Sequence, residues 1–192
     1  MDLQISVFLL FILFTAGHSL SCNLCASSSC TQQTCSSGST CFGLTYVVNT
    51  SVTKGRGCIA ASDCINGFVN LGYIQLSTSC CNTELCNSQD APEPSNTPNG
   101  KKCYYCDVSQ NCTKVLSCSG TEDRCIKASD VNQTAVIKGC ASKSYCDAAA
   151  AVYNATLGSF SCCEGNLCNG AQSVSQSFLF LCCSLLFYFL LH

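Results

Sequence analysis

The cysteines of this chain repeat in two matching sets, and this repeat limits the possible folds more than any other feature of the sequence. The first set is Cys22, Cys25, Cys30, Cys35, Cys41, Cys58, Cys64, Cys80, Cys81 and Cys86. The second set is Cys103, Cys106, Cys112, Cys118, Cys125, Cys140, Cys146, Cys162, Cys163 and Cys168. Cysteines matched in order are 81 to 84 positions apart. Agreement over ten positions indicates a tandem duplication, so two domains of similar structure are predicted.

The amount of cysteine predicts what holds these domains together. The chain has 22 cysteines among 192 residues, or about 11%, which exceeds the roughly 8–10% that marks a disulfide scaffold. A repeat of about 70 residues seldom obtains more than about 3–5 kcal/mol from its hydrophobic core. A disulfide that closes a loop of about 20 residues adds roughly 3 kcal/mol in the chain-entropy estimate. We therefore expect disulfides, formed in an oxidising compartment, to be the framework of the fold.

The residues alone leave the pairing open, because eight cysteines already allow about a hundred connectivities and ten allow more. Cys80 and Cys81 are not expected to bond to each other, since a vicinal bridge departs from ordinary disulfide geometry. They are therefore expected to bond to two different partners. Metal binding and thiol redox chemistry are the alternatives for the CxxC motifs.

Each set of ten opens with CxxC and closes with CCxxxxCN. These motifs are "CNLC" and "CCNTELCN" in the first copy, and "CYYC" and "CCEGNLCN" in the second. They resemble the domain shared by the urokinase receptor and the lymphocyte-antigen-six proteins. The resemblance implies an all-β, disulfide-rich fold of two tandem three-finger (LU) domains, in which three β-hairpin loops extend from a disulfide-bonded palm. The urokinase receptor has three such domains and this chain has two, so urokinase binding is not implied.

The same resemblance implies a pairing of the cysteines and a role for the closing asparagines. The first domain would contain Cys22–Cys41, Cys25–Cys30, Cys35–Cys58, Cys64–Cys80 and Cys81–Cys86. The second domain would contain Cys103–Cys125, Cys106–Cys112, Cys118–Cys140, Cys146–Cys162 and Cys163–Cys168. Asn87 and Asn169, which follow the last cysteine of each set, are similar to the structural cap of the family.

The amino-terminal segment, residues 1–19, is predicted to be a signal peptide. Ile5–Ala16 is an apolar run, and small residues suited to signal-peptidase cleavage follow it. Cleavage is expected after Ser19, with Ser21 as the alternative. The segment departs from the usual pattern because it contains no Lys or Arg. A retained membrane anchor is the alternative, but the run is shorter than the roughly 20 residues that span a bilayer.

The carboxyl-terminal segment, residues 170–192, is predicted to be a propeptide for attachment of a glycosylphosphatidylinositol (GPI) anchor. Phe178–Leu191 is an uncharged apolar run, and Gly170–Ser177 forms a polar spacer before it. The predicted attachment residue is Asn169, with Gly170 as the alternative. A short retained helix is the other interpretation of the tail. The expected location is the extracellular face of the plasma membrane, with secretion as the alternative.

The two domains are predicted at residues 20–90 and 101–169, joined by a Pro-rich linker at 91–100 that contains all three prolines. Proline favours an extended spacer, which leaves open whether the domains touch or stand apart. Segments rich in β-branched or aromatic residues predict strands at 40–48, 68–76, 134–140 and 153–161. Only 147–153 favours a helix, of a single turn. Gly67–Leu76 has few charges and predicts a buried hairpin, with a contact surface or packing against the second domain as alternatives.

The sequence argues against catalysis. The two histidines, His18 and His192, lie in the segments predicted to be removed, so the mature chain would lack Ser-His-Asp and Cys-His pairs and mixed Cys/His zinc sites. The neighbouring acids Glu122 and Asp123 are predicted to lie in a surface loop. The glycines of "KGRGC" are predicted at a turn or strand end, since no helix pattern follows to form a phosphate site. We expect no enzyme activity, no cofactor and no metal.

Four Asn-x-Ser/Thr sequons occur between the two terminal segments, at Asn49, Asn111, Asn132 and Asn154. Asn111 has cysteine at its middle position and is the weaker acceptor. Asn49 and Asn132 occupy matching places in the two repeats, near the tip of the second finger by the family pattern. Glycans there would direct a partner protein to other surfaces; ordinary solubilising glycosylation is the alternative.

The expected function is non-catalytic binding of an extracellular or cell-surface protein, for adhesion or for modulation of a receptor or protease. The expected membrane contact is through the lipid anchor only. The mature region would carry nine Lys/Arg and ten Asp/Glu, a balance with no electrostatic footprint for nucleic acid. The alternatives are a binding protein similar to the secreted phospholipase inhibitors of the same family, and a protective glycoprotein coat without a single partner.

Overall fold

The computed structural model of the chain describes residues 19–26, 29–107, 109, 111–132, 134–156 and 158–170, and only the backbone of residues 26 and 154–156. The predicted signal peptide and the predicted GPI propeptide lie outside these residues, apart from Ser19 and Gly170. Within the described ranges, no helix is both long enough and apolar enough to cross a membrane.

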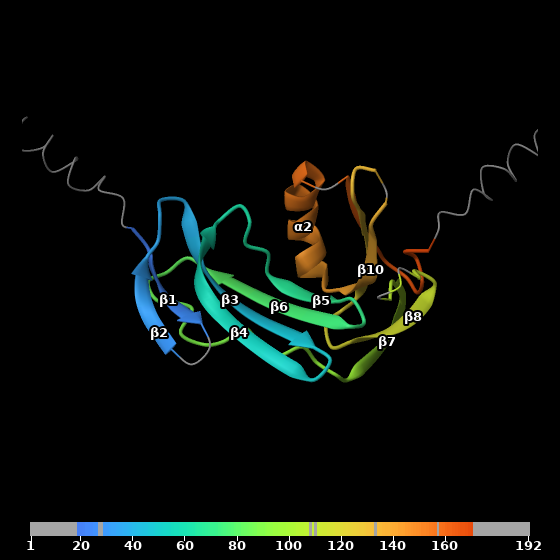
Figure 1. Cartoon of the computed structure of the whole chain (residues 1–192), viewed down its shortest axis with the longest axis horizontal. Coiled ribbons are helices and arrows are strands. Elements are labelled where there is room, and N and C mark those ends of the chain that lie inside the picture. Colours follow the sequence, from blue (N-terminus) through green and yellow to red (C-terminus); the bar gives the residue numbers. More distant parts are fainter. Residues whose placement is uncertain are drawn as a thin grey trace, which may run out of the picture.

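Three antiparallel hairpins form the first domain (Figure 1). They pair β1 (Ser21–Ala26) with β2 (Ser29–Thr34), β3 (Ser39–Val48) with β4 (Ser51–Ala60), and β5 (Gly67–Asn70) with β6 (Ile74–Cys81). β3 also pairs with β6, and β1 with β4, so the three fingers form one sheet. The long β3–β4 hairpin turns at Asn49, whose φ of 55° is a left-handed conformation that asparagine tolerates better than most residues.

The second domain repeats the first two hairpins and changes the third. β7 (Pro98–Tyr105) and β8 (Lys114–Ser119) form a separate two-stranded sheet. β9 (Arg124–Ser129) pairs with β10 (Val136–Ala141) and with β11 (Ser159–Cys163). A helix, α2 (Lys143–Thr156), takes the place of the first strand of the third hairpin. β7 already begins at Pro98, so the last part of the Pro-containing segment belongs to a strand.

Helix α2 corrects two predictions. It has 14 residues, so the prediction of a single turn was wrong, and the strand predicted at 153–161 is found only from Ser159 onward. The Ser142 hydroxyl caps the helix by accepting a hydrogen bond from the Tyr145 amide at 3.3 Å. Tyr145 and Ala149, four residues apart on one face, are buried. The cap and this buried face extend an alanine-rich segment into a full helix.

The two domains share one sheet, because β10 of the second domain pairs with β5 of the first. Cys140 lies opposite Asn70 and Ala141 opposite Val69, and the Ser142 amide donates to the Phe68 carbonyl at 2.9 Å. Within the described residues the nine strands run in the order β11-β9-β10-β5-β6-β3-β4-β1-β2. The domains therefore touch, and Gly67–Leu76 packs against the second domain, one of the alternatives that the sequence left open.

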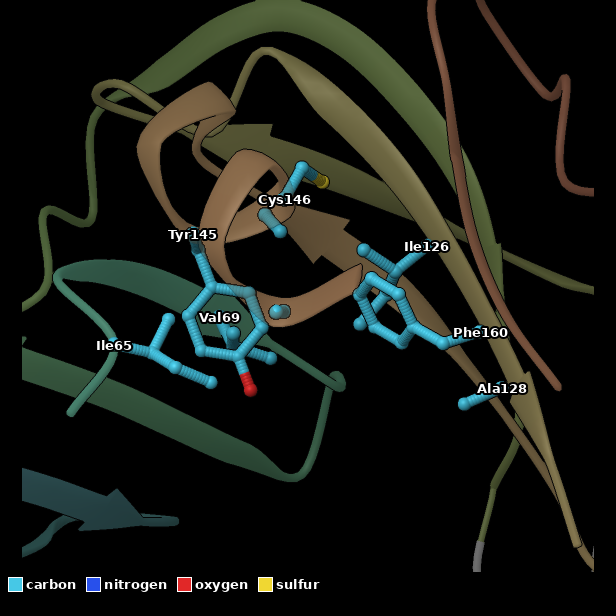
Figure 2. Packing of buried hydrophobic residues seen from close by; sticks show 9 residues of the cluster. Ile65, Val69, Ile126, Ala128, Tyr145, Cys146 and Phe160 are labelled. Atoms are coloured by element: carbon cyan, nitrogen blue, oxygen red, sulfur yellow. The ribbon is translucent and has the colours of Figure 1, made fainter. Parts of the chain in front are cut away.

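The main hydrophobic core is built across this joint. Figure 1 shows α2 on one side of the sheet, beside β5 and β10. In Figure 2 the Tyr145 ring of α2 lies over Val69 and near Ile65 of the first domain, while Phe160 lies beside Ile126 of the second. All five side chains are buried in one cluster. Since both domains contribute to it, separating them would expose the core of the second domain.

Candidate functional site

The rigid part of each domain is its disulfide palm. The structure contains the ten bridges that the family resemblance implied, five in each domain. Cys80 bonds to Cys64 and its neighbour Cys81 bonds to Cys86. Two groups of three cysteines have sulfur atoms within 4.8 Å of one another: Cys22, Cys35 and Cys58, and Cys103, Cys118 and Cys140. Their members all belong to disulfides, so these sulfurs are not free thiolate ligands.

The closing asparagines make the same hydrogen bonds in both domains. The Asn87 side chain accepts from the Asn23 amide at 2.8 Å and donates to the carbonyls of Asn23 and Phe42 at 2.9 and 3.1 Å. The Asn169 side chain accepts from the Tyr104 amide at 2.9 Å and donates to the carbonyls of Tyr104 and Ile126 at 2.9 and 2.8 Å. Each buried carboxamide thus joins the first strand of its domain to a strand of the second finger.

The predicted glycan acceptors lie at the periphery. Asn49 and Asn132 are exposed in the turns that connect β3 to β4 and β9 to β10. Asn111 is exposed between β7 and β8, and its side-chain oxygen accepts from the Thr113 amide at 3.1 Å. The backbone of Asn154 lies in α2, and its side chain is outside the described residues.

The acidic pair does not form an exposed acid–base site. Asp123 is part of the loop between β8 and β9, where its carboxylate accepts from the Lys143 amide at the start of α2 at 2.8 Å. Glu122 is 2% exposed, so its predicted place on the surface was wrong. One of its oxygens accepts from the Ser119 amide at 2.9 Å and from the Asn70 side chain of the first domain at 3.3 Å.

Burial of Glu122 raises the pKa of its carboxyl group, although the two hydrogen bonds act in the opposite direction. The group borders a pocket of about 110 Å³ at the joint, lined by Phe68, Glu93, Ser95, Ser119, Gly120, Thr121 and Glu122. The Glu122 carboxylate accepts hydrogen bonds from both domains. A structural role at the joint therefore explains its position better than a catalytic role does.

One face of the first-domain sheet is covered by the chain that leads to the second domain. We call it the linker face; it carries Thr45, Lys54, Arg56 and Ser77. The Thr45 hydroxyl donates to the Ala91 carbonyl at 2.6 Å. Arg56 binds Asp90, and Lys54 binds Glu93 at 2.8 Å. The Arg56 hydrogen bond is the main cause that lowers the pKa of the Asp90 carboxyl group.

The opposite face of the same sheet is apolar and half-buried. We call it the open face; its apolar side chains are Leu24, Phe42, Leu44, Tyr46, Val48, Ile74 and Leu76, with Gly55 and Gly57 between them. The uncharged polar residues Thr53 and Thr78 lie on the same side. The register places Tyr46 opposite Leu76, and Leu44 opposite Gly55. Leu24 is 42% exposed, and the others are partly exposed. The alternating apolar residues of β3, "FGLTYV", were the sequence signal for this face, but its position beside α2 could not be predicted.

Gly55 and Gly57 lie inside β4, so their predicted place at a turn or strand end was wrong. A Cβ added to Gly57 would lie 3.2 Å from the Phe42 ring and 3.3 Å from Leu24. Because Gly57 has no side chain, Phe42 and Leu24 can lie over β4 at this position. A Cβ added to Gly55 would meet only the Cys25 carbonyl oxygen within 4 Å, at 3.9 Å. Gly55 is therefore a position on the open face where a side chain would be uncrowded by the described residues.

Comparison with known proteins agrees with this architecture. A profile of the family described as "Snake toxin and toxin-like protein" matches residues 102–169. The urokinase plasminogen activator surface receptor of Rattus norvegicus is 30% identical over 152 aligned residues, covering 70% of this chain and 46% of the receptor. Phospholipase A2 inhibitor LNF2 of Lachesis muta muta is 32% identical over 142 residues, covering 63% of this chain and 70% of the inhibitor.

A second inhibitor, phospholipase A2 inhibitor 1 of Protobothrops flavoviridis, is 34% identical over 139 residues and is covered for 68% of its length. The chain thus spans less than half of the receptor and about two thirds of each inhibitor. These relatives and the matching cysteine framework lead to one assignment. The chain belongs to the three-finger family of the urokinase receptor and the lymphocyte-antigen-six proteins.

Proposed function

We propose that this protein is a GPI-anchored cell-surface glycoprotein that binds an extracellular protein without catalysing a reaction. One observation carries the proposal: the relatives, matched over lengths that exceed a single domain, are a receptor and inhibitors, both of which act by binding. Proteins of this kind are secreted or located at the cell surface. The cross-domain core supports the proposal, because a rigid two-domain body presents one fixed surface to a partner.

The anchoring part of the proposal rests on the two ends of the sequence. In this scheme residues 1–19 are the signal peptide, 20–90 and 101–169 the two domains, 91–100 the linker, and 170–192 the removed propeptide. Asn169 would carry the lipid on its main-chain carboxyl group, which leaves its buried carboxamide in the capping position. Gly170 is the alternative attachment residue.

Two measurements test the two parts of the proposal separately. Treatment of intact cells with phosphatidylinositol-specific phospholipase C should release the protein into the medium if it carries a GPI anchor. Protein that stays on treated cells would contradict the anchor. A screen of the residue 20–169 fragment against arrayed extracellular proteins should give a saturable partner, whereas binding to many proteins without saturation would instead support a protective coat.

A second candidate function is a soluble inhibitor of a secreted phospholipase. The extent of the alignments favours it. The chain aligns with 68–70% of the length of the phospholipase A2 inhibitors but with only 46% of the length of the receptor. An enzyme assay with secreted phospholipases A2 decides between the candidates. Inhibition at a one-to-one ratio would support the inhibitor, and full enzyme activity at excess protein would exclude it for the enzymes tested.

A further inference from the structure

We propose that the open face of the first domain is a docking surface for an amphipathic helix of the partner protein. The inference rests on the proposed binding function and deepens it by naming the surface and the chemistry of its occupant. Four observations carry it: the composition of the face, its continuity with the joint between the domains, the absence of a side chain at Gly55, and the location of the charges.

The face presents a connected row of apolar side chains. Along β3, alternate residues Phe42, Leu44 and Tyr46 point to the same side of the sheet, as the strand period requires. Leu76 of β6 lies opposite Tyr46, and Leu24 of β1 approaches the space over Gly57. Because these side chains are only partly buried, an apolar partner would remove further apolar surface from water.

The row is continuous with an interface that already holds a helix. Val69 lies opposite Leu76 across β5 and β6, and Val69 belongs to the core on which Tyr145 of α2 packs. Leu76 itself is half-buried against that core. One row of side chains therefore passes from a part of the sheet covered by α2 to a part without that cover. The chain itself thus shows which kind of element packs on this face.

Gly55 leaves one place in the row of the open face without a side chain. Gly55 lies between Leu44 of β3 and the end of β1, and the space where its Cβ would project meets only one atom within 4 Å. A side chain of an approaching helix can come close to the strand at this place. An amphipathic helix presents apolar residues at positions i, i+3, i+4 and i+7, which form a ridge on one side.

The charges of the first-domain sheet are on its other side. Lys54 and Arg56 belong to the linker face, where they bind Glu93 and Asp90. β3 and β6 contain no charged residue. The open face is therefore an uncharged surface on a domain with few charges, which favours an apolar contact and disfavours a phosphate, a nucleic acid or an acidic peptide as occupant.

The test uses the intact glycosylated protein and two peptide libraries. One library holds helix-constrained peptides of about 15 residues, or roughly four turns, and the other holds disulfide-closed hairpin peptides of the same length. Two variants alter the open face in different ways. Leu24→Ser removes apolar surface, and Gly55→Val adds a side chain at the uncrowded position in the middle of the face.

Two control variants change apolar residues of similar exposure elsewhere. Val52→Ser lies near the tip of the same β3–β4 hairpin, opposite Val47 on the other side of the sheet from Tyr46, and Val115→Ser lies on β8. Their side chains are 48% and 51% exposed. Melting temperatures equal to wild type establish that each variant is folded, and if one open-face variant fails this criterion the other still decides.

The expected result is saturable binding of helical peptides that Leu24→Ser and Gly55→Val each weaken at least about tenfold, with no effect of the controls. The inference is overturned if only hairpin peptides bind, if no helical peptide binds saturably, or if the open-face variants bind as tightly as wild type. Concentration-dependent self-association that these variants abolish would identify a second copy as the occupant, and would also overturn it. If Gly55→Val keeps wild-type affinity for a partner found by screening, the binding function stands and this surface is excluded.

Discussion

The shared sheet makes a specific prediction for Gly139→Ala. Gly139 lies in β10, next to the residues that pair with β5. A Cβ at this position would lie 2.2 Å from the Asn70 carbonyl oxygen and 3.0 Å from the Leu71 side chain, whereas ordinary contacts begin at 3.4 Å. The two strands would therefore have to move apart by about 1 Å, because the atom in the way belongs to the backbone.

Such a movement would break the hydrogen bonds of the joint. The Ser142 amide and the Phe68 carbonyl are 2.9 Å apart, and a further 1 Å exceeds hydrogen-bond distance. Overpacking of this kind costs roughly 1–3 kcal/mol. At roughly 2–4 °C per kcal/mol for a chain of this size, the melting temperature should fall by roughly 2–12 °C.

Differential scanning calorimetry measures the stability loss, and amide hydrogen exchange locates it. Exchange should become faster at residues 69–70 and 140–142, while the disulfide palms keep their protection. Gly55→Ala is the matched control, because it adds the same methyl group to a strand where the nearest atom is 3.9 Å away. If Gly139→Ala melts at the temperature of Gly55→Ala and leaves exchange at the joint unchanged, the reasoning that the two domains share one sheet is wrong.

Three further predictions concern the cap, the buried acid and the glycans. Asn87→Ala should lower the free energy of unfolding by about 2–4 kcal/mol, because it leaves several buried backbone groups unpaired. Denaturant titrations under non-reducing conditions measure this, with the exposed Asn82→Ala as the control. Equal effects of the two substitutions would contradict the capping role. Glu122 has a pKa raised by burial above its ordinary 4.5, so ionisation costs more in the folded state. The free energy of unfolding of wild type minus that of Glu122→Gln should therefore be highest at and below about pH 4.5, and it should fall as pH rises from there through the raised pKa. A difference that does not change with pH would refute this. Replacing Asn49 and Asn132 by Gln should lower the apparent mass on gels and leave partner binding equal or stronger, whereas loss of binding would exclude the shielding role.

Predictions from the sequence agreed with the structure where a residue type has one structural role, such as a disulfide or a cap. The intervals between cysteines, together with the family resemblance, implied a disulfide framework that the structure also contains, and the closing asparagines indicated the caps at Asn87 and Asn169. The β-branched residues of 40–48 predicted a strand that is found as β3. The strand signal is local, because alternation along a strand depends on residues close in sequence. The cysteine and asparagine signals instead come from the family pattern, since Asn87 bonds to Asn23, 64 positions away.

Other predictions failed where distant residues decide the outcome. Glu122 was placed on the surface because it neighbours another acid, Asp123, in a predicted loop beside Cys125, but it is buried and accepts a hydrogen bond from Asn70 of the other domain. Gly55 and Gly57 lie inside a strand because β3 and β1 pack across them, which a local turn propensity does not reveal. The helix is longer than predicted because Ser142 caps it and the core of both domains buries Tyr145.

The sequence by itself indicated a duplicated, disulfide-rich fold, because ten cysteines repeat in register, and the family resemblance added the pairing of those cysteines. Only the tertiary structure decided that β5 and β10 join two domains into one sheet. It also decided that the linker covers the charged face while the apolar face stays partly exposed beside α2. The physical reason is that alternation along a strand shows that two faces differ, whereas the neighbour that covers each face comes from residues far away in the chain.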